Sequence, residues 1–267
     1  MSYQLGFIGA GNMAEAIAKA AIEQAVLAPG QMTTADPLEA RCAVFASMGV
    51  VVAPTNAELI AHSKQVLLAV KPQAMAQVAA DLAAHGREDQ VVISIMAGIP
   101  SGKLAEAIGR PTRIVRVMPN TPLVVGCGMA GIARGGHAPA GDENLAIRLF
   151  SAGQSRAIRV DESVLDAITA LSGSGPAYLF YLAEAMQRAA SDLGLAEHAS
   201  LLVGQTLLGA AQLLSTSAQT PAELRRKVTS PGGTTEAAIR HMDGNRAMDV
   251  IVNAIKAAHE RSTQLGS

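Results

Sequence analysis

The sequence predicts an α/β domain over residues 1–160 followed by an all-helical domain over residues 161–267. In the first part, short β-rich apolar runs alternate with longer Ala-rich stretches, a pattern typical of βαβ units around a parallel sheet. From about Asp161 the β-branched runs give way to long Ala/Leu segments with helical periodicity. A chain of 267 residues is long enough for two such domains.

The predicted strands are short apolar runs that each end in residues typical of turns. The run at 113–118 stops at Pro119, which cannot donate to a β-ladder. The strands expected in this way are residues 5–8, 31–34, 66–70, 91–95 and 113–118, with further candidates around 128–133 and 157–160.

Helices are predicted from apolar residues that recur at helical spacing. Between the first two strands, Met13, Ile17, Ala21 and Ala25 form one apolar stripe, so residues 12–26 read as a crossover helix that packs on the sheet. In the second part the expected helices are residues 163–171, 176–193, 196–215, 221–228, 235–241 and 245–264.

The segment 199–211 is apolar nearly all round and carries no charge, so it should be buried on every side. A single layer of about 100 helical residues cannot easily bury it, and we expect this part to pack against a second copy of the chain. Gly204, Gly209 and Ala210 would permit close helix contact. The alternative is that the segment is the central helix of a monomeric bundle.

Composition argues against several classes of partner. With 21 Lys+Arg against 22 Asp+Glu, a net charge of −1 and no basic run, the chain has no means of neutralising a nucleic acid or an anionic membrane surface. The sequence shows no targeting segment and no run of about 18 apolar residues, so we expect a soluble protein without a membrane partner.

The cysteines and histidines give no sign of a metal or a disulfide framework. Cys42 and Cys127 are too few and lack C-x-x-C spacing, which fits a reducing cytoplasm. The six histidines stand apart, without the spacing that places two ligands on one helix face, so we expect no metal.

The strongest motif is G-x-G-x-x-A at residues 9–14, directly between a predicted strand and a predicted helix. Gly9 permits a tight turn, Gly11 lets the backbone approach a pyrophosphate, and the helix N–H groups face the anion. The alternative is a purely structural glycine turn, but the flanking elements favour a Rossmann-like dinucleotide site.

Asp36, at the end of the second strand, is expected to accept hydrogen bonds from a ribose diol, which points to NAD. It would repel the extra phosphate of NADP, whereas the nearby Arg41 would offset that repulsion, so the choice of cofactor stays open. Asp36, followed by Pro37, is alternatively a turn residue or helix cap.

Further polar and glycine-rich loops lie at strand ends and helix starts. Lys71 and Ala97 follow two successive strands, where ligands bind in open α/β sheets. Lys71 then either pairs with a phosphate or carboxylate or is a solvated loop residue. The loop 229–236 places backbone N–H groups and hydroxyls at a helix start, which suits a small carboxylate but is also ordinary capping.

Taken together, the motifs resemble the pyrroline-5-carboxylate reductase family. They are, in order, G-F-I-G-A-G-N-M, A-V-K-P-Q, M-P-N-T-P, L-S-G-S-G-P-A-Y and V-T-S-P-G-G-T-T-E, and they extend over nearly the whole chain. The resemblance implies a two-domain enzyme that reduces the cyclic imine 1-pyrroline-5-carboxylate to L-proline with NADPH or NADH, the last step of proline biosynthesis. It also implies a homodimer formed through the helical domain, in some members a decamer of five dimers.

The resemblance also implies the site residues. Cofactor contacts are expected at Gly9, Ala10, Gly11, Asn12, Met13, Asp36, Asn56, Val70, Lys71 and Ala97. Substrate contacts are expected at Ser230, Gly233, Thr234 and Thr235, with weaker claims for Lys227 and Asp161. Thr235 is the expected catalytic residue, because its hydroxyl can hydrogen-bond the ring nitrogen of the imine and help its protonation. Which subunit's cofactor the Thr235 loop faces stays open.

Two other functions are compatible with parts of the sequence. A β-hydroxyacid dehydrogenase also joins a Rossmann domain to helices, but it needs a K-x-x-x-N pattern that the helical part lacks. A nucleotide-sensing regulator would explain the first domain but would leave the loop 230–235 with no task beyond capping.

Overall fold

The computed structural model describes residues 2–266, which form two compact units. The sheet unit contains the residues up to Ser174 together with those from Ala258 on, and the helical unit is Gly175–Ala257. Each unit has its own architecture and is described by itself.

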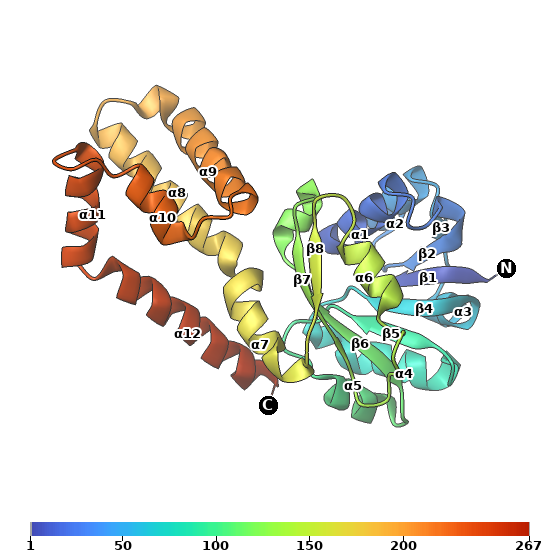
Figure 1. Cartoon of the computed structure of the whole chain (residues 1–267). Coiled ribbons are helices and arrows are strands. Elements are labelled where there is room, and N and C mark those ends of the chain that lie inside the picture. The colour runs from blue at the N-terminus through green and yellow to red at the C-terminus, as the bar shows by residue number, and fades with distance from the viewer. Residues whose placement is uncertain (1, 267) are drawn as a thin grey trace. The chain divides into compact units, whose positions relative to one another are not determined.

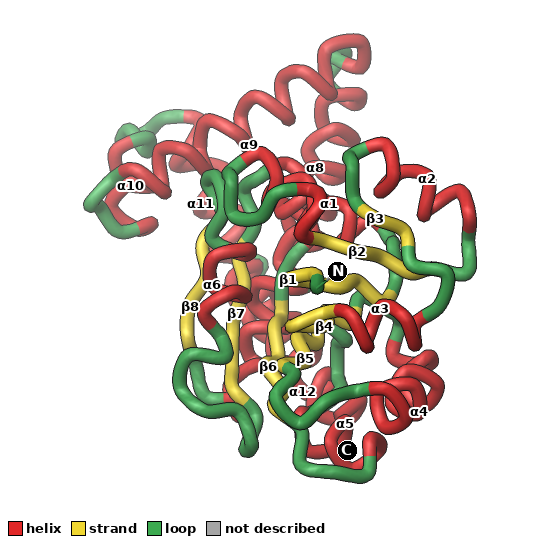
Figure 2. Tube along the Cα trace, turned by 90° about the vertical axis from the view of Figure 1, so that its right-hand side faces the viewer, coloured by secondary structure: helices red, strands yellow, loops and turns green. Residues whose placement is uncertain are grey.

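Within residues 2–266, eight strands of the sheet unit form one sheet in the order β3-β2-β1-β4-β5-β6-β7-β8 (Figures 1 and 2). Neighbouring strands from β3 to β6 are parallel, β7 is antiparallel to β6, and β8 is parallel to β7. The strands are β1 Tyr3–Ile8, β2 Met32–Ala35, β3 Val51–Val52, β4 Ser63–Leu68, β5 Val91–Ser94, β6 Arg113–Met118, β7 Met129–Arg134 and β8 Arg156–Arg159.

Helices cover both faces of this sheet because its central strands are apolar on both sides. Alternate residues of β1 enter different cores: Leu5 and Phe7 pack on one face with α1, whereas Ile8 packs on the other with α3, α4 and α5. The helices are α1 Asn12–Glu23, α2 Glu39–Ser47, α3 Asn56–His62, α4 Met75–His85, α5 Ser101–Ile108, α6 Asn144–Phe150 and α7 Leu165–Ile168. The predicted α/β class is thus confirmed.

The sheet unit extends beyond residue 160. Leu165 and Ala170 are buried, and the side chains of Leu165 and Ile168 lie directly over Gly131 of β7, so the first turns after β8 belong to the sheet. The predicted helix at 163–171 is three short pieces: a 3₁₀ turn at Glu162–Val164, α7, and a π turn at Thr169–Gly173.

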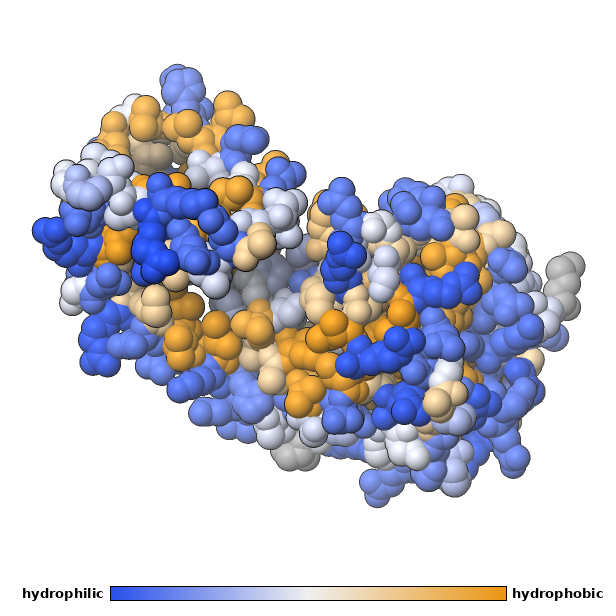
Figure 3. All heavy atoms as spheres, viewed as in Figure 1, coloured by the Kyte–Doolittle hydropathy of each residue, from blue (hydrophilic) through white to orange (hydrophobic). Residues whose placement is uncertain are grey.

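The helical unit is built from helices (Figure 1), and many of their large apolar side chains are exposed (Figure 3). They are α8 Gly175–Asp192, α9 Ala199–Thr216, α10 Pro221–Lys227, α11 Thr234–Gly244 and α12 Ala247–Gly266, whose last turns return to the sheet unit. Among the residues of α9 that the structure describes, only Ala199 and Val203 are buried. Burial of the segment 199–211 is therefore not achieved by the described helices of the helical unit alone.

The helical stretch Ala196–Thr216 is long and apolar enough, by length and composition alone, to cross a membrane. The expectation that no such stretch exists is therefore wrong. The expectation missed this stretch because Gln205, Thr206 and Gln212 interrupt any unbroken apolar run, whereas the mean hydropathy over the helix remains high.

A buried arginine joins three segments of the sheet unit. Arg116 of β6 is 6% exposed and lies 3.4 Å from Glu162 and 3.8 Å from Asp166. Glu162 accepts from the backbone N–H of Ser101 at the start of α5, and Asp166 accepts from Ser262 of α12 at 2.7 Å. The carboxylates compensate the charge of the guanidinium in a site that excludes most water.

Replacing this arginine should destabilise the sheet unit. We expect Arg116→Ala to lower the free energy of unfolding by about 3 kcal/mol, because Glu162 and Asp166 lose their buried partner. Urea unfolding at fixed protein concentration measures the change. Lys19→Ala removes an exposed ion pair with Glu15 and should cost less than about 1 kcal/mol. Equal midpoints for the two variants would contradict the structural role of Arg116.

Candidate active site

The sequence-predicted cofactor residues gather at one edge of the sheet, where β1 to β5 end. The order of strands reverses between β1 and β4, since β2 and β3 lie on one side and β5 and β6 on the other. In open α/β sheets, ligands bind outside the carboxyl ends of the strands at such a reversal.

Gly9 makes the tight turn that follows β1. It has φ +95°, and a Cβ at this position would lie 2.7 Å from the carbonyl oxygen of Ala69, just beyond β4. The backbone N–H of Ala69 donates to Ile8 at 2.9 Å, so the loops after β1 and β4 are in direct contact. Only glycine fits both the conformation and the space.

Gly11 leaves the start of α1 open. It is the N-cap of the helix, has no capping side chain, and a Cβ added there would have no atom within 4 Å. The first N–H groups of α1, beginning at Asn12 and Met13, therefore have no side-chain partner from the cap and face an open, exposed edge. This cradle fits the pyrophosphate of a dinucleotide.

Asp36 follows β2 and holds the same loop. Its Oδ2 accepts from the backbone N–H of Ala10 at 2.7 Å, and its Oδ1 accepts from Leu38 at 2.9 Å. The second bond is the turn contact expected of an aspartate before a proline. The first places the carboxylate beside the phosphate-binding loop, where a ribose would be recognised.

The other expected cofactor residues lie at the same edge. Asn56 begins α3 after β3, and its side chain donates to Asp81 of α4 at 2.8 Å. Val70 and the exposed Lys71 follow β4, and the exposed Ala97 follows β5. The structure thus brings all ten of these residues to the ends of β1 to β5.

Asn120, the central residue of the motif M-P-N-T-P, is a polar residue of this unit that was not among the predicted site residues. It lies after β6, its amide nitrogen donates to the backbone oxygen and hydroxyl of Ser172 at 3.2 and 3.3 Å, and its oxygen accepts from Met129 at 2.8 Å. The motifs M-P-N-T-P and L-S-G-S-G thus meet in space.

Asp161 stands apart from the cofactor residues. It follows β8, which runs opposite to β1, and it lines a separate cavity of about 310 Å³ with Arg134, Glu143 and Arg159. The structure does not bring Asp161 to the edge formed by the ends of β1 to β5.

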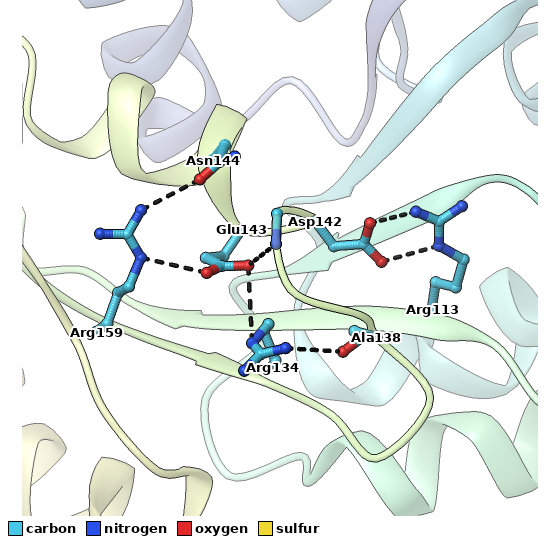
Figure 4. A network of polar contacts seen from close by, with 8 residues as sticks. Arg113, Arg134, Ala138, Asp142, Glu143, Asn144 and Arg159 are labelled. Atoms are coloured by element: carbon cyan, nitrogen blue, oxygen red, sulfur yellow. Dashed lines mark hydrogen bonds and ion pairs between the residues drawn. The ribbon is translucent and has the colours of Figure 1, made fainter.

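Glu143 is the centre of the charges around that cavity (Figure 4). Its carboxylate lies 3.2 Å from Arg159 and 3.7 Å from Arg134, and it accepts from the N–H of Gly141 at 3.0 Å. Burial raises the pKa of Glu143, but the backbone and arginine contacts outweigh burial and hold this pKa below its ordinary value.

In the helical unit, the expected substrate residues surround the start of α11. Gly233 is the N-cap without a capping side chain, and Thr234 and Thr235 form the first turn. Glu236 accepts from the N–H of Gly232 at 2.8 Å, which fixes the preceding loop. This leaves N–H groups and hydroxyls available for an anion.

Two other expected substrate residues lie on the approach to this helix. Ser230 is exposed in the loop before Gly233, and its carbonyl accepts from the Gly233 N–H at 3.0 Å. Lys227 is exposed at the end of α10.

Two family models match the chain. Residues 162–265 match the family described as pyrroline-5-carboxylate reductase dimerisation. Residues 4–98, which carry the loop around Gly9, match the family described as NADP oxidoreductase coenzyme F420-dependent.

Relatives named pyrroline-5-carboxylate reductase are similar over nearly the whole length. The protein from Pseudomonas aeruginosa is 43% identical over 98% of this chain and 96% of its own, and that from Glycine max is 40% identical over 99% and 96%. Among solved structures, a pyrroline-5-carboxylate reductase from Coxiella burnetii has a TM-score of 0.91 at 34% identity and covers both chains completely. A Plasmodium falciparum pyrroline carboxylate reductase with NADP bound has a TM-score of 0.88 at 29% identity, covering 99% and 98%.

The lowered pKa of Glu143 predicts a pH dependence of stability. A carboxylate whose pKa is lower in the folded state stabilises the fold above its unfolded pKa, and this contribution disappears as the pH falls. We therefore expect Glu143→Gln to be less stable than wild type at pH 7 and to lose less stability between pH 6 and pH 3. Urea unfolding across this range tests it, with the exposed Glu88→Gln as control. Parallel curves for wild type and Glu143→Gln would contradict the expectation.

Proposed function

The chain belongs to the pyrroline-5-carboxylate reductase family, and from this premise we propose how its own residues carry the reaction. The enzyme reduces 1-pyrroline-5-carboxylate to L-proline as an NAD(P)H-dependent oxidoreductase of proline biosynthesis. The observation that carries the assignment of residues is that both α1 and α11 begin at a glycine without a capping side chain. The two anionic parts of the reaction, pyrophosphate and carboxylate, each need such a helix start.

We assign NADP(H) to the edge of the sheet unit. Support comes from the NADP oxidoreductase match over residues 4–98 and from the relative solved with NADP bound. Within the loop from Gly9 to Met13, the N–H groups of Gly11, Asn12 and Met13 hold the pyrophosphate, because those of Gly9 and Ala10 already donate to Ala35 and Asp36. Asp36 lies where the ribose is recognised. The remaining contacts are Asn56, Val70, Lys71 and Ala97. When bound, the dinucleotide supplies the hydride.

We assign the imine substrate to the start of α11. The N–H groups of Thr234 and Thr235, directly after the N-cap Gly233, and the hydroxyl of Ser230 hold its carboxylate, because a helix N-terminus favours a negative charge. The hydroxyl of Thr235 hydrogen-bonds the ring nitrogen, orients the C=N bond and assists its protonation. Lys227, at the end of α10, adds a positive charge on the approach. Asp161 remains the least supported of the predicted substrate contacts, since it lies away from the ends of β1 to β5.

The family match also explains the exposed apolar helices. Residues 162–265 form a dimerisation region, so the chain is a homodimer in which a partner covers apolar side chains of the helical unit. We propose further that five dimers form a decamer, which analytical ultracentrifugation would reveal. We place the enzyme in the cytoplasm, since its cysteines, Cys42 and Cys127, are both free.

Thr235→Ala should lower turnover by roughly 10- to 1,000-fold, because one proton-donating or orienting group typically contributes about 10²- to 10⁴-fold. Oxidation of NADPH on addition of 1-pyrroline-5-carboxylate measures this loss, while an unchanged melting temperature shows that the protein is folded. Thr235→Ser keeps the hydroxyl and should retain most activity. Thr216→Ala, which removes a hydroxyl bonded only within α9, is the control. Full activity of Thr235→Ala would remove the assigned role.

Gly11→Ala should weaken the binding of NADP⁺ by roughly ten-fold or more, because the added methyl group occupies the space that the pyrophosphate needs. The fold should tolerate it, since a Cβ at Gly11 meets no atom within 4 Å. Titration of the variant with NADP⁺ tests this. Gly30→Ala, at another open glycine outside the site, should bind like wild type. Equal affinities for the two variants would contradict the placement of the pyrophosphate.

A further inference from the structure

The peptide of Ala10 is held from two sides by groups with opposite charge. Its N–H donates to Oδ2 of Asp36 at 2.7 Å, and its carbonyl accepts from Nε of Arg41 at 2.6 Å. In dinucleotide-binding folds, an acidic residue after the second strand recognises a ribose 2′-hydroxyl, whereas a nearby arginine accommodates a 2′-phosphate. The chain carries both at one place, and they favour opposite cofactors.

Arg41 has a second acceptor that the reaction itself does not require. Its Nη2 donates to Oε2 of Glu15 at 2.8 Å, and the other oxygen of Glu15 accepts from Lys19 at 2.6 Å. The side chains of Arg41 and Glu15 are only 25% and 21% exposed, so solvent shields this pair incompletely. Hydrogen bonds from Lys19 and then from Arg41 lower the pKa of Glu15, so its carboxylate is charged at neutral pH.

We propose that Glu15 determines the choice between NADPH and NADH by competing with the ribose 2′-phosphate for Arg41. This inference rests on the proposed binding of NADP(H) at this edge. With Nε on Ala10 and Nη2 on Glu15, the guanidinium has two of its donors engaged. Three donors remain, but Glu15 already compensates the positive charge of Arg41, so a 2′-phosphate must compete with this carboxylate for that charge. NADH, which meets Asp36 with a neutral hydroxyl, makes no such demand.

The local charges support the same conclusion. Asp36 and Glu15 carry two negative charges, and Arg41 and Lys19 carry two positive ones, so the four side chains cancel. A phosphate monoester brings about −1.5 to −2 charges at neutral pH. A ribose site without net charge therefore attracts the 2′-phosphate of NADPH only weakly and does not weaken the binding of NADH. Removing the charge of Glu15 would leave this site with a net positive charge.

The test is Glu15→Gln, which keeps the size of the side chain and removes its charge. Isothermal titration with 2′,5′-ADP and 5′-ADP isolates the ribose end of the site, with NADP⁺ and NAD⁺ titrated in parallel. We expect 2′,5′-ADP and NADP⁺ to bind about three- to ten-fold more tightly, and 5′-ADP and NAD⁺ to change by less than about two-fold. Glu23→Gln removes the same charge from the last residue of the same helix and should change neither.

Arg41 must carry the effect if the competition is real. Arg41→Gln should weaken 2′,5′-ADP selectively, and adding Glu15→Gln to it should give no further change. The inference would be overturned if Glu15→Gln changed the affinities for 2′,5′-ADP and 5′-ADP equally, or changed neither. It would also be overturned if Glu15→Gln still tightened the binding of 2′,5′-ADP in the Arg41→Gln background. Failure of both ligands to bind wild type would overturn the cofactor site together with it. Normal binding without turnover of 1-pyrroline-5-carboxylate would instead count only against the proposed function.

Discussion

The close approach of Gly9 to the backbone of Ala69 is the constraint on which the rest of the cofactor edge depends. A parallel pair such as β1 and β4 brings two loops to the same edge, and these loops can touch only if one of them lacks a side chain. The positive φ of Gly9 turns the chain sharply, so α1 starts directly beyond β1. That turn places the peptide of Ala10 where both Asp36 and Arg41 reach it.

Arg116 plays a comparable role where the chain leaves the sheet unit and returns to it. Asp166 lies shortly before the exit at Ser174, and Ser262 lies shortly after the return at Ala258. The hydrogen bond between Asp166 and Ser262 connects these two segments, and Arg116 of β6 forms an ion pair with Asp166. A buried guanidinium is costly by itself, so its presence on a central strand is best explained by this anchoring of several segments.

Much of the fold could be predicted from local pattern, and the misses have physical causes. The strand predicted at 113–118 is confirmed as β6. A run rich in β-branched residues that ends at Pro119 predicts a strand and also its last residue. The strand β3 escaped prediction because it has two residues, both exposed, and so shows no alternation. The need of α9 for a second copy of the chain was predicted from its uncharged apolar surface, but the side chains that the partner covers were not, because one sequence does not contain the interface.

The same distinction separates the predictable from the unpredictable parts of the site. In the proposed site, Gly9, Gly11 and Gly233 act through the backbone, so their spacing in the sequence already indicates the task assigned to them. Glu15 lies at an ordinary surface position of an amphipathic helix, and its importance arises only when the fold brings Arg41 of α2 to its carboxylate. The proposed recognition of pyrophosphate and carboxylate uses backbone groups and does not require particular side chains in the first turn of α1. Cofactor choice is therefore the property that such side chains are best placed to adjust, since they meet the one group, a ribose phosphate, by which the two dinucleotides differ.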